Sequence, residues 1–215
     1  MKNKHPNPLG ADRADRLAVA SQQYVPIRRE LPERARRQYE LLIKFFVASE
    51  SFFFMALIIS YLYYRGVNQM IDMTDQVLNA QSTGMFTALL VLSSGTLWWG
   101  RHHLERQKPV RLAWGLAATI ALGAVFLYGQ GLEYAHLLRE NVTVDRNIFG
   151  SAFFTLTGFH ALHVFVGLIL LSIVLILTLL GDFTGPRSAA VAATELYWHF
   201  VDVVWLIVFT VVYLI

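Results

Sequence analysis

Cysteine is absent from the 215-residue sequence, and charged residues are scarce. The missing thiols exclude disulfide bonds, iron–sulfur clusters and thiolate metal sites. Charged residues make up 15% of the chain, against about 25% in an ordinary globular domain. Hydrophobic residues make up 55%, and the mean hydropathy is +0.46. A soluble protein of this length could not bury so much apolar surface, so the composition predicts a membrane protein.

Several motifs of soluble enzymes are also missing. The sequence has no nucleotide-binding loop, no nucleophile elbow and no zinc-protease signature. It shows no internal repeat, which removes support for a transporter built from inverted repeats. The net charge of +3 and the pI of 9.3 arise from an N-terminal arm and one short loop. This distribution indicates membrane topology rather than a nucleic-acid-binding face, and we expect no nucleic-acid partner.

Residues 1–40 are polar and carry much of the positive charge. Ten of the eighteen Lys and Arg residues lie in this segment or just after it, at Lys44. We expect an irregular, basic cytoplasmic arm over 1–40, with a short surface helix at Asp12–Ala20, and one helical domain over 41–215. The basic residues that we expect beside lipid head groups are Arg34, Arg36 and Arg37.

Five long apolar stretches follow the arm. Each reaches the roughly 20 residues that a helix needs to cross about 30 Å of hydrocarbon. They are continuously apolar instead of alternating, which favours helices over barrel strands. The sequence therefore predicts an all-α membrane protein, a bundle of five transmembrane helices. The stretches are approximately Leu41–Tyr64, Gln81–Gly100, Val110–Leu132, Ile148–Leu180 and Ala189–Ile215.

Basic residues are divided unevenly between the two sides of the predicted bundle. If the N-terminus is cytoplasmic, the arm and the loops Arg101–Pro109 and Gly181–Ser188, with the adjoining helix ends, hold fifteen of the eighteen. The outer loops hold only Arg65, Arg139 and Arg146. By the positive-inside rule, this split predicts a cytoplasmic N-terminus and a periplasmic C-terminus.

One carboxyl group lies deep inside the first apolar stretch. Glu50 is about ten residues, or ~15 Å, into this span and is followed closely by phenylalanines. A charge at this depth costs roughly 2.5–3.5 kcal/mol on insertion scales, so acids in membrane spans are often functional. We expect Glu50 to take part in proton movement or lipid contact. The alternative is an acid that only forms a hydrogen bond to a neighbouring helix.

The last two stretches carry five polar residues that we expect to form an interhelical seam. Glu195, His199 and Asp202 lie at i, i+4 and i+7, so a helix places them on one face. His160 and His163, at i and i+3, share a face of the preceding helix. We expect hydrogen bonds among these groups to join the two helices. A metal or haem site is the alternative, because histidines and acids at helical spacing also build such sites in bundles.

These motifs together resemble subunit III of the haem–copper oxidases, from about Ile43 to the C-terminus. Tyr197–Trp205 is similar to the last-helix signature of that family, and Thr157–Val164 resembles the helix before it. Glu50, with the phenylalanines after it, resembles the family's carbodiimide-reactive glutamate. Further matching positions are Gln130, Glu133 and Tyr134 in a Q-x-x-E-Y element, and Ser94, Gly95, His102 and His103.

The resemblance implies a subunit of an aerobic respiratory oxidase, in a bacterial inner membrane, that itself holds no haem, copper or other metal and no catalytic residue. It implies packing on the catalytic subunit I, beside subunit II, with haem and copper in these partners. Subunit IV or a respiratory supercomplex is a further candidate partner. Bound phospholipid and support of sustained oxygen reduction and proton uptake are also implied.

Some features depart from the larger family members. Those members have seven helices and hold lipid between the first two and the rest, whereas the five stretches here correspond to the last five. Many members have Trp where this chain has Ile59. Many also have a basic residue at the inner end of the penultimate helix, where this chain has Leu177–Leu180.

Other functions remain open alongside this one. Within the family, the chain could serve a quinol oxidase or an assembly associated with nitric-oxide reductase. Outside it, a haem-b or quinone membrane anchor would use His160, His163 and His199. A secondary transporter would use Glu50 and Asp202. A redox difference spectrum separates the anchor from the oxidase subunit, and solute uptake by the reconstituted chain separates the transporter.

Overall fold

The computed structural model describes residues 33–67, 80–106, 108–140, 142–143, 148–181 and 189–215. The surface helix predicted at Asp12–Ala20 lies outside these residues. The chain divides into two compact units, Met1–Arg37 and Gln38–Ile215. All the contacts described below lie within the second unit.

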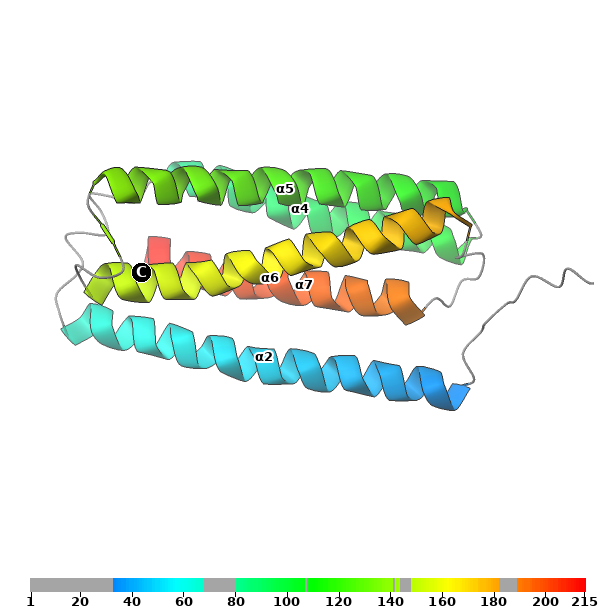
Figure 1. Cartoon of the computed structure of the whole chain (residues 1–215), viewed down its shortest axis with the longest axis horizontal. Helices are drawn as coiled ribbons and strands as arrows, with labels where there is room; N and C mark the ends of the chain where they lie inside the picture. Colours follow the sequence, from blue (N-terminus) through cyan, green and yellow to red (C-terminus); the bar gives the residue numbers. More distant parts are fainter. Residues whose placement is uncertain (1–32, 68–79, 107, 141, 144–147, 182–188) are drawn as a thin grey trace, which may run out of the picture. The chain divides into compact units, whose positions relative to one another are not determined.

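Five long helices make up most of the described chain, one for each predicted apolar stretch (Figure 1). This confirms the predicted all-helical fold. The last helix continues into a short π-helical turn, η1, close to the C-terminus. The elements are α2 (Glu33–Val67), α4 (Ala80–Glu105), α5 (Pro109–Arg139), α6 (Ile148–Leu179), α7 (Ala189–Phe209) and η1 (Thr210–Leu214).

The helix α2 begins at Glu33, earlier than the predicted start at Leu41. The residues before the apolar stretch are rich in Glu and Arg, which are good helix formers. The helix therefore crosses residue 40, where we expected the irregular arm to end. Three basic residues of the expected arm lie in its first turns, at Arg34, Arg36 and Arg37.

Four of the five described helices are long and apolar enough to cross a membrane. These spans are Arg37–Gly66, Pro109–Arg139, Gly150–Leu179 and Ala189–Leu214. The helix α4 is not among them, although its 26 residues would extend about 39 Å. Its serine, threonine, glycine and tryptophan residues lower its hydropathy, so a fifth span remains a prediction.

Three hydroxyl-bearing residues of α4 face the interior of the bundle rather than the surface. Thr83, Thr87 and Ser93 are all buried. The helix also lies very close to α5, where Gly100 and Gly115 meet backbone to backbone. Small residues allow this approach, as they do at many membrane helix interfaces. Part of the low hydropathy of α4 therefore comes from hydroxyl groups that face other helices.

Burial is distributed unequally among the helices. In the most apolar part of α7, 56% of the residues are buried, whereas the corresponding share of α2 is 6%. The indole of Trp198 on α7 is completely buried and lies against Gly123 of α5 and Gly167 of α6. Figure 1 shows α2 running beside α6 and α7. The helix α7 is therefore the core element, and α2 is a peripheral one.

Candidate functional site

A ladder of polar contacts joins α4 to α7. The predicted set Glu195, His199 and Asp202 does lie along one face of α7, and that face meets α4. Arg101 forms an ion pair with Glu195 at one end of the ladder. The next contact is between Nδ1 of His199 and Oγ of Ser94, at 2.9 Å. Ser94 also donates a hydrogen bond to Asp202.

The hydrogen atoms of this ladder follow from its chemistry. A serine hydroxyl has one proton, and Ser94 gives it to the carboxylate of Asp202. Its oxygen must therefore accept the proton of Nδ1 on His199. The other ring nitrogen, Nε2, lies 3.8 Å from Glu195. Donors consequently run in one direction, from His199 through Ser94 to the buried Asp202.

Two buried tryptophans of α7 extend the ladder along α4. Nε1 of Trp198 donates to Oγ of Ser93 at 3.0 Å. Nε1 of Trp205 donates to Oγ1 of Thr87 at 2.9 Å. The hydroxyls of Ser93 and Thr87 thus serve two indole nitrogens that α7 would otherwise bury without a partner, which helps to hold the two helices together.

A second polar cluster surrounds Glu133 of α5. Tyr213 of η1 donates to this carboxylate at 2.7 Å, and Thr83 of α4 donates at 3.1 Å. Gln130 donates at 3.4 Å. Tyr134, the next residue of the predicted Q-x-x-E-Y element, donates to Thr157 of α6 at 2.8 Å. This element thus connects α5 to its neighbours on both sides.

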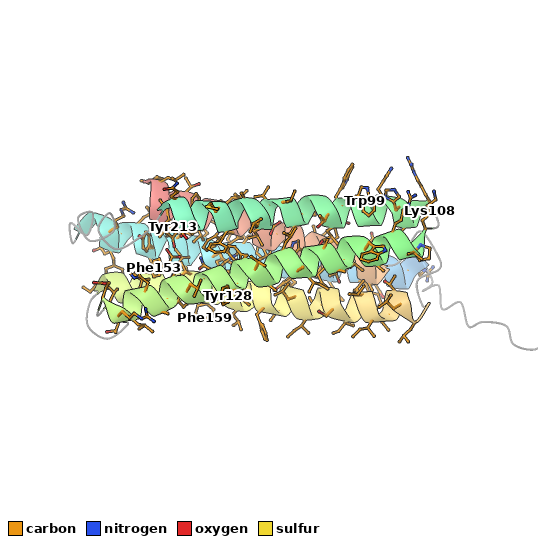
Figure 2. All side chains as sticks on the ribbon, turned by 90° about the horizontal axis from the view of Figure 1, so that it is seen from above. Trp99, Lys108, Tyr128, Phe153, Phe159 and Tyr213 are labelled. Carbon is orange, nitrogen blue, oxygen red and sulfur yellow. The ribbon has the colours of Figure 1, made fainter. Side chains whose placement is uncertain are left out.

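The Arg101–Glu195 end of the ladder and the Glu133 cluster lie toward opposite ends of α4. Figure 2 shows Tyr213, beside the Glu133 cluster, and Phe153 near one end. It shows Trp99 and Lys108 near the other, where α4 ends and α5 begins.

Glu50 and His163 form a polar contact between α2 and α6. The carboxyl Oε2 of Glu50 lies 3.2 Å from Nε2 of His163. The other ring nitrogen contacts the carbonyl oxygen of Phe159 at 2.7 Å. Tyr197 of α7 donates to the carbonyl of His163 at 3.1 Å. The ring of Phe54 lies 5.0 Å from the imidazole, so the pair has an apolar neighbour.

His160 makes no hydrogen bond to any described residue. Both of its ring nitrogens are buried and lack a partner within the described chain. Its ring stacks on Trp205 at 4.7 Å between centroids. The ring centroids of Phe54 and Phe126 lie 6.3 and 6.2 Å from that of His160. Its observed contacts are therefore those of an aromatic core residue.

Among the contacts of the described residues, no hydrogen bond joins His160 or His163 of α6 to Glu195, His199 or Asp202 of α7, as the expected seam required. Glu195, His199 and Asp202 face α4, His163 faces α2, and His160 stacks on Trp205. The spacing along each helix identified the shared faces, but periodicity does not say which helix a face meets. Ser94, Ser93 and Thr87 of α4 take up the polar groups of α7 instead.

The remaining predicted residues lie at the end of α4. His102 stacks on Trp98 at 5.9 Å, and Nδ1 of His103 contacts the carbonyl of Trp99 at 2.8 Å. Across the residues that the structure describes, no three His, Asp or Glu side chains come together as a metal site.

Arg65 was not recognised from the sequence, where it was counted with an outer loop. It lies instead in the last turn of α2 and is buried. Its Nη1 contacts the carbonyl oxygens of Val211 and Val212 at 3.3 and 3.4 Å. The last carbonyls of a helix have no partner within it, and a guanidinium stabilises them by hydrogen bonding and by charge. The sequence signal that could have indicated this contact is a single arginine directly after a long apolar stretch.

Comparisons with known proteins agree on one family. The family model described as cytochrome c oxidase subunit III matches residues 33–215. A protein named cytochrome c oxidase subunit 3 from Corynebacterium diphtheriae is 38% identical over 138 residues, 64% of this chain and 67% of its own length. The protein of the same name from Thermostichus vulcanus is 34% identical over 170 residues, 79% of this chain and 83% of its own. That from Synechocystis is 37% identical over 172 residues, 79% and 72% of the two chains. The polar motifs of α2, α5, α6 and α7 and the match over 33–215 lead to one conclusion: this chain belongs to the cytochrome c oxidase subunit III family, part of an oxidoreductase complex.

Proposed function

We propose that this chain is a subunit without a redox centre that packs on the haem- and copper-bearing subunit I, beside subunit II. The observation that carries the proposal is the family match over nearly the whole helical part of the chain. The internal pairing of its polar groups supports it. Glu195, His199 and Asp202 contact α4, and Glu133 contacts three other side chains. These side chains stabilise this chain's own bundle.

Phospholipid is the proposed ligand of the outer surface. Large apolar side chains of α2 are exposed, among them Phe45, Phe52 and Ile59. In a bilayer these side chains contact acyl chains or a partner's helices. The proposed effect on catalysis is indirect: the subunit and its lipids maintain the environment in which subunit I takes up protons and reduces oxygen.

The proposed topology has five spans in a bacterial inner membrane, with a cytoplasmic N-terminus and a periplasmic C-terminus. The uneven distribution of Lys and Arg supports it. Arg65 does not weaken the charge argument for this orientation, because it is a buried residue of α2 and not a loop residue. The close backbone contact between Gly100 and Gly115 supports a membrane-spanning α4, since it holds that helix against the spanning α5.

Purification of the tagged chain in mild detergent tests the proposal. We expect haem- and copper-containing oxidase subunits to come with it in fixed proportion. After separation from them, the chain should show no stoichiometric haem or copper in metal analysis or in a reduced-minus-oxidised spectrum. A chain that purifies alone, or that keeps a haem of its own, would reject the proposal and favour the membrane-anchor alternative. Among relatives the printed names specify cytochrome c oxidase, which favours that enzyme over a quinol oxidase.

A further inference from the structure

One face of α7 carries a regular stripe of exposed side chains. Leu196, Val203 and Leu206 are exposed on this face, and His199 lies among them with 37% of its side chain exposed. These four residues, named here the α7 stripe, are at i, i+3, i+7 and i+10. This is the spacing of the a and d positions in a seam between two helices, and most membrane bundles pack with the same geometry. The α7 stripe therefore has the pattern of a helix-packing surface.

His199 is the polar member of the stripe, and it lies near the middle of the membrane span. The spanning segment of α7 is Ala189–Leu214, which places His199 about 4 Å along the helix axis from its midpoint. At this depth a lipid offers only hydrocarbon, and polar side chains there almost always face protein or a water-filled cavity. An imidazole exposed at this depth indicates that another protein segment covers it in the membrane.

The second ring nitrogen of His199 lacks a hydrogen-bond donor. Because Nδ1 donates to Ser94, the Nε2 of a neutral ring carries a lone pair. Oε1 of Glu195 lies 3.8 Å from Nε2, which is too far for the hydrogen bond that an imidazolium would make. The carboxylate of Glu195 is moreover paired with Arg101. Within the part of the chain that the structure describes, Nε2 accepts no hydrogen bond, so the missing partner is a donor.

We propose that the α7 stripe binds a transmembrane helix of another oxidase subunit, and that a hydroxyl, amide or indole group of this helix donates a hydrogen bond to Nε2 of His199. The three apolar residues of the stripe supply the packing. One polar residue in an otherwise apolar seam fixes the register of the two helices, and His199 has this role here. The proposal rests on the proposed function, because it names the surface and the contact by which this chain packs in its complex.

Photocrosslinking in the native membrane tests which molecule covers the stripe. Benzoylphenylalanine replaces Val203, which is exposed and lies one helical turn from His199. After illumination the intact oxidase is purified, and the crosslinked peptides are identified by mass spectrometry. We expect a crosslink to a transmembrane segment of another oxidase subunit, and we expect this segment to carry a Ser, Thr, Asn, Gln, Tyr or Trp near the middle of its span.

Two variants separate the hydrogen bond to the partner from the one to Ser94. His199→Gln places an amide oxygen about where Nε2 lies, so it keeps an acceptor for the partner. His199→Asn is shorter, so its amide reaches Ser94 but not the partner. We expect His199→Asn to raise the dissociation constant of this chain from the detergent-solubilised oxidase about fivefold, the factor for one neutral hydrogen bond of about 1 kcal/mol. His199→Gln should stay near the wild type. The control Ser172→Ala removes a hydroxyl of α6 that bonds only within its own helix, to the carbonyl of Leu168, and should change nothing.

Crosslinks from position 203 to lipid alone, or to a second copy of this chain, would overturn the proposal. So would equal dissociation constants for His199→Asn and His199→Gln, or a crosslinked helix that carries no donor. The proposed function is judged separately, by whether haem- and copper-bearing subunits purify with the wild-type chain in fixed proportion. If they do while position 203 labels only lipid, the proposed function stands and this surface is not the one that binds them.

Discussion

His163 constrains where a proton lies between two helices. The carbonyl oxygen of Phe159 can only accept, so Nδ1 of His163 carries a hydrogen. Nε2 then faces Glu50 either as a lone pair opposite a protonated carboxyl or as part of an imidazolium opposite a carboxylate. In both cases one proton is held between α2 and α6. Both ring nitrogens of His163 therefore have a partner, and the contact with Glu50 needs no further proton donor.

Replacement of Glu50 by Gln tests whether this proton is only held or also passed on. The amide can still donate to Nε2 of His163, so we expect the variant oxidase to assemble and its initial turnover to stay near that of the wild type. Oxygen consumption of both enzymes across neutral and alkaline pH measures this. A steep loss confined to alkaline pH would show that Glu50 relays protons.

Asp202 is the final acceptor of the hydrogen bonds that run from His199 through Ser94. In Asp202→Ala the hydroxyl of Ser94 loses its acceptor. A lost hydrogen bond between membrane helices costs about 0.6–2 kcal/mol. We therefore expect less of this chain to remain bound to the oxidase after detergent purification, while the haems of subunit I stay intact. Asp202→Asn keeps an acceptor of the same shape and should restore binding. Full assembly with lost turnover would instead indicate a direct chemical role.

At the scale of elements, the contact between α4 and α5 depends on two glycines. A Cβ atom added to Gly115 would lie 2.8 Å from Cα of Gly100 and 2.8 Å from the carbonyl oxygen of Thr96. Both are backbone atoms, so the helices themselves must move apart. We expect Gly115→Ala to destabilise the bundle by about 1–3 kcal/mol, the usual cost of overpacking. Thermal unfolding of the purified complex measures the effect.

The control lies on the same helix. A Cβ atom at Gly131 meets nothing within 4 Å. Alanine is a better helix former than glycine by about 0.5–1 kcal/mol, so Gly131→Ala should be neutral or stabilising. Equal destabilisation by the two substitutions would show that the close approach of α4 and α5 is unimportant.

Arg65 joins the end of α2 to the end of the core helix. Hydrogen bonds to charged groups contribute about 1.5–3 kcal/mol, and Arg65→Met removes those to Val211 and Val212. We expect the variant to unfold at a lower temperature and its C-terminal end to be cleaved faster by proteases. Arg139→Met removes an exposed arginine and should change neither. If Arg65→Met is as stable as the wild type, these hydrogen bonds give no net stabilisation, because they only offset the desolvation cost of the buried charge.

At the scale of the whole molecule, the two ends of α5 report the topology. The chain has no cysteine, so a single introduced thiol is the only one that a reagent can label. Glu140 and Lys108 flank α5 and are both exposed. With a cytoplasmic N-terminus and five spans, Glu140→Cys should react with a membrane-impermeant reagent in intact cells, and Lys108→Cys should react only after lysis. The reverse pattern would contradict the proposed orientation.

Most of the fold could be predicted from the sequence because a bilayer restricts the choices. A continuously apolar stretch of about 20 residues must be a helix, since nothing else satisfies its backbone in hydrocarbon. The shared face of Glu195, His199 and Asp202 followed from helical periodicity alone. The family likewise followed from ordered motifs. Local spacing carries this kind of information, because it depends only on residues near each other in the chain.

Only the tertiary structure decided which helix each polar face meets. The α7 face was expected opposite His160 and His163, but it pairs with Ser94 and Arg101 of α4. The sequence determined by itself that this protein is a helical membrane chain with buried polar groups and the motifs of subunit III. The structure determined the partners of those groups, because pairing depends on how close two helices come. That distance is set by side-chain volumes summed over whole interfaces, such as the glycines between α4 and α5, and no short motif records it.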